Sequence, residues 1–178
     1  MIMKKLILAM TLMMGLLICA PAHASKGEME IGGGLLFDFS HYARMYGGGV
    51  DLFARYEVID SLQVALSLYL TGNYTRHHKH SFGLFHLRAG ALYNFDVVAW
   101  VPYVGAYITT LFSDHDDYRW HAKDFGLGVD LELGVAYKGI RPLGIGLSLT
   151  YHIFFTKMRA MPDFFTLSLW FSYSLGKI

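Results

Sequence analysis

Two neighbouring stretches alternate between bulky apolar residues and small or polar ones: FGLGVDLELGVAY at residues 125–137 and GIGLSLTYHIFF at residues 144–155. A period of two predicts β-strands. The polar face carries Gly, Ser and Thr with Asp130 and Glu132, and it is too small and too poor in Lys and Glu to face bulk water. The pattern is typical of a transmembrane β-barrel, which turns bulky side chains to lipid and small or charged ones to a narrow lumen.

The start of the chain predicts export. Lys4 and Lys5 form a positive region, an apolar run follows at residues 6–18, and Ala22-His23-Ala24 is a small-x-small cleavage site. We therefore expect a signal peptide at residues 1–24 and one barrel domain at residues 25–178. A membrane anchor would need about 20 apolar residues. A lipoprotein cut before Cys19 would need a small residue where Ile18 stands.

The composition of the mature part excludes several protein classes. All acidic residues follow Ala24 whereas Lys4 and Lys5 precede it, so the formal net charge falls from +1 for the whole chain to −1 for the mature part. This balance gives no basis for nucleic-acid binding. The single cysteine lies in the signal, so disulfides cannot stabilise the mature chain. A closed barrel in lipid can, because every backbone group is paired between strands.

The mature chain divides into eight predicted strands, and a tilted spanning strand needs about 9–11 residues. We predict them at residues 28–39, 46–58, 62–73, 82–95, 101–112, 123–137, 144–155 and 164–175. The connections alternate between polar segments rich in His, Arg and Asp and shorter ones, as expected for outside loops and periplasmic turns. The predicted fold is an all-β, eight-stranded antiparallel transmembrane barrel with an up-and-down meander. A lipocalin-like soluble barrel would need dense charge where Gly144, Gly146 and Ser148 stand.

Some bulky residues fall on the predicted polar face. They are Leu36, Phe53, Tyr69, Leu84, Phe154 and Trp170. These residues either fill the lumen or indicate local errors in the strand assignment. The strand at 101–112 is apolar on both faces, so the pattern does not orient it.

The chain resembles the small eight-stranded outer-membrane β-barrels, a group that includes the OmpA barrel domain and OmpX/Ail-type proteins. The resemblance is carried by PYVGA at residues 102–106, by FGLGVDLELG at residues 125–134 and by the alternating final strand. It implies a porin-like integral protein of the bacterial outer membrane, folded by the barrel assembly machinery and surrounded by lipid and lipopolysaccharide. One departure is the end of the chain, SYSLGKI, because such proteins usually end on an aromatic residue.

The predicted lumen face collects ionisable residues. We expect a lumen charge network of Glu30, Asp38, Asp51, Arg55, Arg88, Asp130 and Glu132, with Glu57, His86 and His152 on the same face. Buried charges are costly unless paired, and an eight-stranded barrel is only wide enough for its own side chains. We therefore expect a closed or nearly closed polar lumen and a structural or surface-interaction role. The alternative is a narrow gated pore with Arg88 and Arg55 as gates and Asp130 and Glu132 as partners.

A third reading is a lipid A-modifying hydrolase of the PagL type. That family places a catalytic His and Ser two residues apart, and His152 fits the first position. Phe154 stands where the nucleophile belongs, and a base without its nucleophile cannot perform acyl transfer. We expect no catalytic residue, no cofactor and no enzyme activity.

Two polar loops suggest surface chemistry. His78 and His80 could chelate a metal such as Zn²⁺, but the adjacent Arg76 and Lys79 repel cations, so we predict no metal site. The segment 114–121 combines acids with aromatics and could meet lipopolysaccharide or a partner protein, although aromatics also rest at membrane interfaces. We expect a monomer, since a barrel of this size is complete alone.

Overall fold

The computed structural model describes residues 27–40, 44–75, 80–95, 99–114, 124–140, 142–155 and 163–177. The predicted signal peptide at residues 1–24 lies outside them. In the described part of the chain, no helix is long and apolar enough to cross a membrane.

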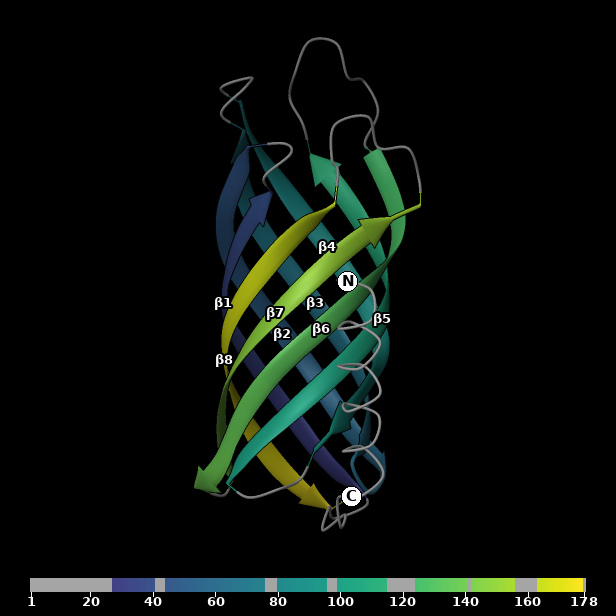
Figure 1. The fold of residues 1–178 in the computed structure, drawn as a ribbon, viewed down its shortest axis with the longest axis vertical. Coiled ribbons are helices and arrows are strands. Elements are labelled where there is room, and N and C mark those ends of the chain that lie inside the picture. The colour runs from purple at the N-terminus through teal and green to yellow at the C-terminus, as the bar shows by residue number, and fades with distance from the viewer. Residues whose placement is uncertain are drawn as a thin grey trace, which may run out of the picture.

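Eight antiparallel strands form a closed barrel in chain order, β1 to β8, and β8 pairs with β1 (Figure 1). Their bounds are β1 Glu28–Ser40, β2 Met45–Ile59, β3 Leu62–Thr75, β4 His80–Asn94, β5 Trp100–Asp114, β6 Asp124–Ile140, β7 Leu143–Phe154 and β8 Phe164–Lys177. The predicted all-β, up-and-down barrel is confirmed. The strands are longer than predicted at several ends, most of all in β6, where a register shift between Tyr137 and Ile140 carries pairing through a predicted turn.

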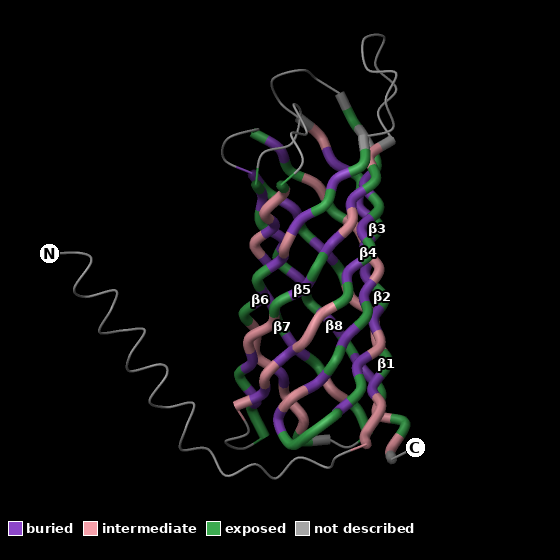
Figure 2. The backbone as a smooth tube through the Cα atoms, turned by 90° about the vertical axis from the view of Figure 1, so that its right-hand side faces the viewer, coloured by how far each residue is buried: buried purple, intermediate pink, exposed green. Residues whose placement is uncertain are grey.

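Buried and exposed residues alternate along every strand (Figure 2). The outward face is almost entirely apolar: Leu35 is 63% exposed, Leu52 59% and Ile108 65%. Buried positions carry most of the polar and charged side chains of the strands. A soluble barrel has the opposite arrangement, with polar side chains outside and apolar ones inside. An apolar outer surface is stable in the hydrocarbon core of a membrane.

The bulky residues on the polar face fill the lumen. Leu36, Phe53, Tyr69, Leu84 and Trp170 are at most 6% exposed, and Phe154 packs against the cluster that contains Leu84. The strand assignment was therefore correct at these positions. The strand that the sequence could not orient, β5, turns one apolar face inward as well, with Val101, Tyr103, Tyr107 and Leu111 buried.

The two ends of the barrel differ in their connections. Residues 60–61, 95–99 and 141–142 join strands at one end, and residues 41–44, 76–79, 115–123 and 155–163 join them at the other. Outer-membrane barrels carry short periplasmic turns and longer outside loops. We call the second end the outer end and the first the inner end.

Gly146 on β7 makes room for the largest side chain in the lumen. A Cβ at Gly146 would overlap the Trp170 indole and lie 2.8 Å from Val135 O. Trp170 is only 1% exposed, so the indole is enclosed by other residues of the barrel.

We expect Gly146→Val to destabilise the barrel by about 1–3 kcal/mol through overpacking. Gly72→Ala is the control, because a Cβ there meets no atom within 4 Å and should change stability by less than about 0.5 kcal/mol. Urea unfolding followed by the gel shift between folded and unfolded barrel measures both. Equal stability of the two variants would contradict this account of lumen packing.

Candidate functional site: the charged lumen

Arg88 on β4 lies at the centre of the lumen and has no exposed surface. Its Nη2 donates a hydrogen bond to Glu132 Oε2 at 2.7 Å. Its Nε lies 2.9 Å from Asp130 Oδ2, an ionic contact without the alignment of a hydrogen bond. Both carboxylates stand on the inward face of β6, so one cation on β4 is paired with two anions across the width of β5.

Two tyrosine rings enclose the same guanidinium. Arg88 Cζ lies 4.4 Å from the Tyr69 ring centroid and 4.0 Å from that of Tyr107. Cation–π contacts of this kind contribute about 0.5–2 kcal/mol each when water is excluded. The Arg88 charge is therefore neutralised by carboxylates and surrounded by aromatic faces, which leaves it little freedom to move.

A series of hydrogen-bonded side chains extends from Asp130 toward the outer end. Asp130 Oδ1 lies 2.8 Å from His152 Nδ1, and His152 Nε2 lies 2.9 Å from Thr166 Oγ1. Thr166 donates to Asp38 Oδ1 at 2.6 Å, and Asn73 Nδ2 donates to Asp38 Oδ2 at 3.2 Å. The bond between Thr166 and Asp38 crosses the seam where β8 closes against β1.

The same network continues toward the inner end. Tyr103 donates its hydroxyl proton to Glu132 Oε1 at 3.1 Å, and Trp170 Nε1 donates to the Tyr103 hydroxyl at 3.0 Å. The connected side chains between Asn73 and Trp170 come from every strand except β2. The network therefore ties the barrel together from inside.

Asp130, His152 and Thr166 are joined in the order of a hydrolase triad, in which a carboxylate orients a histidine beside a hydroxyl. The protons, however, are arranged differently. The single hydroxyl proton of Thr166 is donated to Asp38, so His152 Nε2 does not receive it. All three side chains have no exposed surface. The arrangement connects strands and does not present a nucleophile to a substrate.

Apolar side chains pack in the lumen on both sides of this ionic layer. The inner cluster consists of Phe53, Ala65, Leu92, Val101, Tyr103, Tyr107, Ala136 and Trp170. The outer cluster consists of Met45, Leu84, Leu111 and Phe164, with Phe154 packed against it. Along β4 the order is Leu84, Arg88 and Leu92, so the Arg88 charge lies between the two clusters.

The seven residues of the predicted charge network are all buried, from 0% to 7% exposed. The structure joins Arg88 directly to Asp130 and Glu132, and joins Asp38 to them through His152 and Thr166. Sequence reasoning did not single out Thr166 or Tyr107, and it noted Tyr69 only as a bulky residue on the polar face. Nothing in the alternation distinguishes Thr166 and Tyr107 from other lumen residues.

The other three residues of the predicted charge network lie outside the group that is joined to Arg88. Arg55 lies over aromatic rings, 4.2 Å from the Phe53 centroid and 4.6 Å from that of Trp170. Glu30 is instead 3.3 Å from Lys138 Nζ near the inner end. Asp51 Oδ1 has no hydrogen-bond partner in the described part.

The described residues contain no group of three His, Cys, Asp or Glu that could hold a metal ion. The histidine-loop hypothesis rests on His78 and His80, and the surface-loop hypothesis on the segment 114–121. His78 and residues 115–121 lie outside the described part, so neither hypothesis is tested. His86 is buried beside His152, and neither of its ring nitrogens has a hydrogen-bond partner among the described residues.

The sequence matches the family model described as "Outer membrane protein beta-barrel domain" over residues 8–174. The chain belongs to this family. Its place is therefore the bacterial outer membrane, and the apolar outer wall is its surface toward lipid. No curated protein matches the sequence.

Solved barrels resemble the fold at low sequence identity. Neisserial surface protein A superposes with a TM-score of 0.60 at 20% identity, covering 85% of this chain and 96% of that one. The outer membrane protein OprG from Pseudomonas aeruginosa gives 0.61 at 13%, covering 85% and 97%. The attachment invasion locus protein Ail of Yersinia pestis gives 0.59 at 14%, covering 85% and 100%. These likenesses concern the fold alone.

Removing the central cation should destabilise this family member strongly. We expect Arg88→Met to lower the free energy of unfolding by about 3–5 kcal/mol, because two carboxylates are left buried without a counter-charge. Adding Asp130→Asn and Glu132→Gln to Arg88→Met should recover part of that loss. Urea unfolding in detergent measures both variants, and a triple variant no more stable than the single one would refute the pairing as the cause.

Proposed function

We propose that this protein is a closed outer-membrane barrel with a structural or surface-interacting role, and that solutes do not pass through it. The observation that carries the proposal is Arg88, fully buried and paired with two carboxylates, with an apolar cluster on each side. A solute moving along the axis would have to displace the outer cluster, break the ion pairs and displace the inner cluster. Each step exposes buried groups that have no replacement partner.

The second candidate is a narrow gated pore. Its support is the ionic layer itself, because side chains that exchange charged partners can switch a passage open. The aromatic contacts of Arg88 and Arg55 argue against easy exchange, since both guanidinium groups would leave ring contacts and Arg88 would also leave its two carboxylates. We therefore place the closed barrel first.

An enzyme is the weakest candidate. Thr166 directs its proton to Asp38, and Phe164 stacks on the His152 ring with centroids 4.4 Å apart. A lipid substrate would have no route to these buried atoms. The hydrogen bonds from Asp130 through His152 to Thr166 are therefore better explained as contacts that hold strands together than as a site for acyl transfer.

The location of the barrel in the outer membrane suggests which molecules it contacts. We propose lipopolysaccharide as the lipid contacting the outer half and the barrel assembly machinery as the partner during biogenesis, after removal of residues 1–24. The crystal structure of Ail in complex with the heparin analogue sucrose octasulfate gives a precedent for contacts with a sulfated sugar in a barrel of this fold. For this chain, a partner at the outer loops remains a proposal.

Single-channel conductance tests the closed lumen. The full chain is expressed, purified from the outer membrane in detergent and inserted into planar bilayers. We expect no steady current from the wild type or from Arg88→Ala, because the inner and outer clusters persist when the cation is removed. The matched control is Thr110→Ala, because Thr110 is a half-buried residue on the lipid-facing side of β5. Conductance steps that appear or grow in Arg88→Ala alone would contradict the closed-barrel proposal and support the gated pore.

A further inference from the structure

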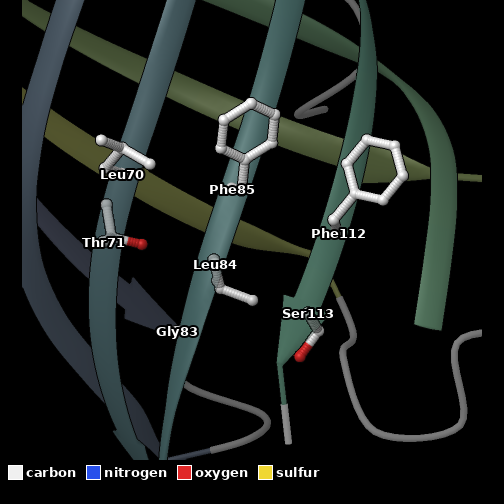
Figure 3. A pocket seen from close by; sticks show the side chains of 7 residues that line it. All are labelled: Leu70, Thr71, Gly83, Leu84, Phe85, Phe112 and Ser113. Carbon is white, nitrogen blue, oxygen red and sulfur yellow. The ribbon is translucent and has the colours of Figure 1, made fainter. Parts of the chain in front are cut away.

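A hollow of about 650 Å³ opens across β3, β4 and β5 (Figure 3). Leu70, Phe85 and Phe112 stand around it, one from each strand, and Gly83 lies among them. The three large side chains are 44%, 38% and 45% exposed, so the hollow opens on the lipid-facing wall. The buried residues Thr71 and Leu84 also line it. Its size lies within the range of about 300–1,000 Å³ typical of small-molecule sites.

The hollow exists because large side chains are interrupted at one place in the wall. Gly83 faces Gly72 in the pairing of β3 with β4, and both residues are exposed. A Cβ at either glycine would meet no atom within 4 Å, and neither has a positive φ. Neither internal packing nor backbone conformation requires glycine here, unlike at Gly146.

The position of the hollow determines what fills it. Gly72 and Gly83 lie close to the outer ends of their strands, and the hollow is continuous with the apolar wall that contacts lipid in this family. Its lining contains no charged side chain. The hydroxyl of Thr71, a lining residue that points inward, already accepts a hydrogen bond from Asn73.

We propose that this hollow is a binding site for one acyl chain of lipid A in the outer leaflet. The proposal rests on the lipopolysaccharide contact of the proposed function for the identity of the lipid, and it does not depend on a closed lumen. Transfer of a chain from bulk lipid to an apolar groove gains no hydrophobic energy. The gain comes from close packing, since the chain can approach the bare backbone of Gly83 while the Leu70, Phe85 and Phe112 side chains contact its sides.

Native mass spectrometry tests the site. The full chain is expressed, purified from the outer membrane in mild detergent and titrated with lipid A, and with phosphatidylethanolamine as the comparison lipid. We expect lipid A to bind more tightly, and Gly83→Leu, which fills the hollow, to weaken lipid A binding by about threefold to tenfold. Ala106→Leu is the matched control, because it adds the same bulk to an exposed position of β5 away from the hollow.

Three results would overturn the proposal: equal lipid A binding by Gly83→Leu and wild type, an equal loss in Ala106→Leu, or equal affinity for phosphatidylethanolamine. If Gly83→Leu does not fold, Gly72→Leu adds the same bulk beside the hollow from the opposite strand and is held to the same outcomes. Conductance reports on the lumen and lipid binding on the wall, so a failure of one proposal is distinguishable from a failure of the other.

Discussion

The charge of Arg88 has to be neutralised at the centre of a barrel that stands in lipid, and much of the interior follows from that constraint. A buried cation without counter-charges would cost several kcal/mol. Asp130 and Glu132 supply the counter-charges from β6, and the Tyr69 and Tyr107 rings pack against the guanidinium. The remaining acceptors of the two carboxylates are used by His152 and Tyr103, which extends the network toward both ends of the barrel.

The outward and inward faces of the same strands have to meet different requirements. Pairing around the closed ring satisfies the backbone, which lipid cannot do. The outward side chains need only be apolar, whereas the inward ones must fill the lumen and satisfy one another. Trp170 shows how closely these requirements are linked, because its indole fits only where Gly146 lacks a side chain, and its Nε1 donates to Tyr103.

Much of the fold could be predicted from the sequence, because the face of each residue follows from a period of two. The number of strands and the inward position of Glu30 or Arg88 depend on that period. The ion pairs could not be predicted, since Arg88 meets acids two strands away and the stagger between strands is set by barrel geometry. The orientation of β5 could not be predicted either, because its inward residues, such as Tyr103 and Leu111, belong to the apolar clusters inside the lumen.

Thiol accessibility tests the closed lumen most directly. Ser168 is inward-facing and 1% exposed on β8, and the only cysteine of the chain is Cys19 in the predicted signal, so Ser168→Cys introduces a single lumen thiol. Ser81→Cys at an exposed position near the outer end of β4 is the control. A small, water-soluble, membrane-impermeant thiol reagent applied to intact cells should label Ser81→Cys and leave Ser168→Cys unmodified. Rapid labelling of Ser168→Cys in the folded barrel would contradict a lumen closed by its own side chains.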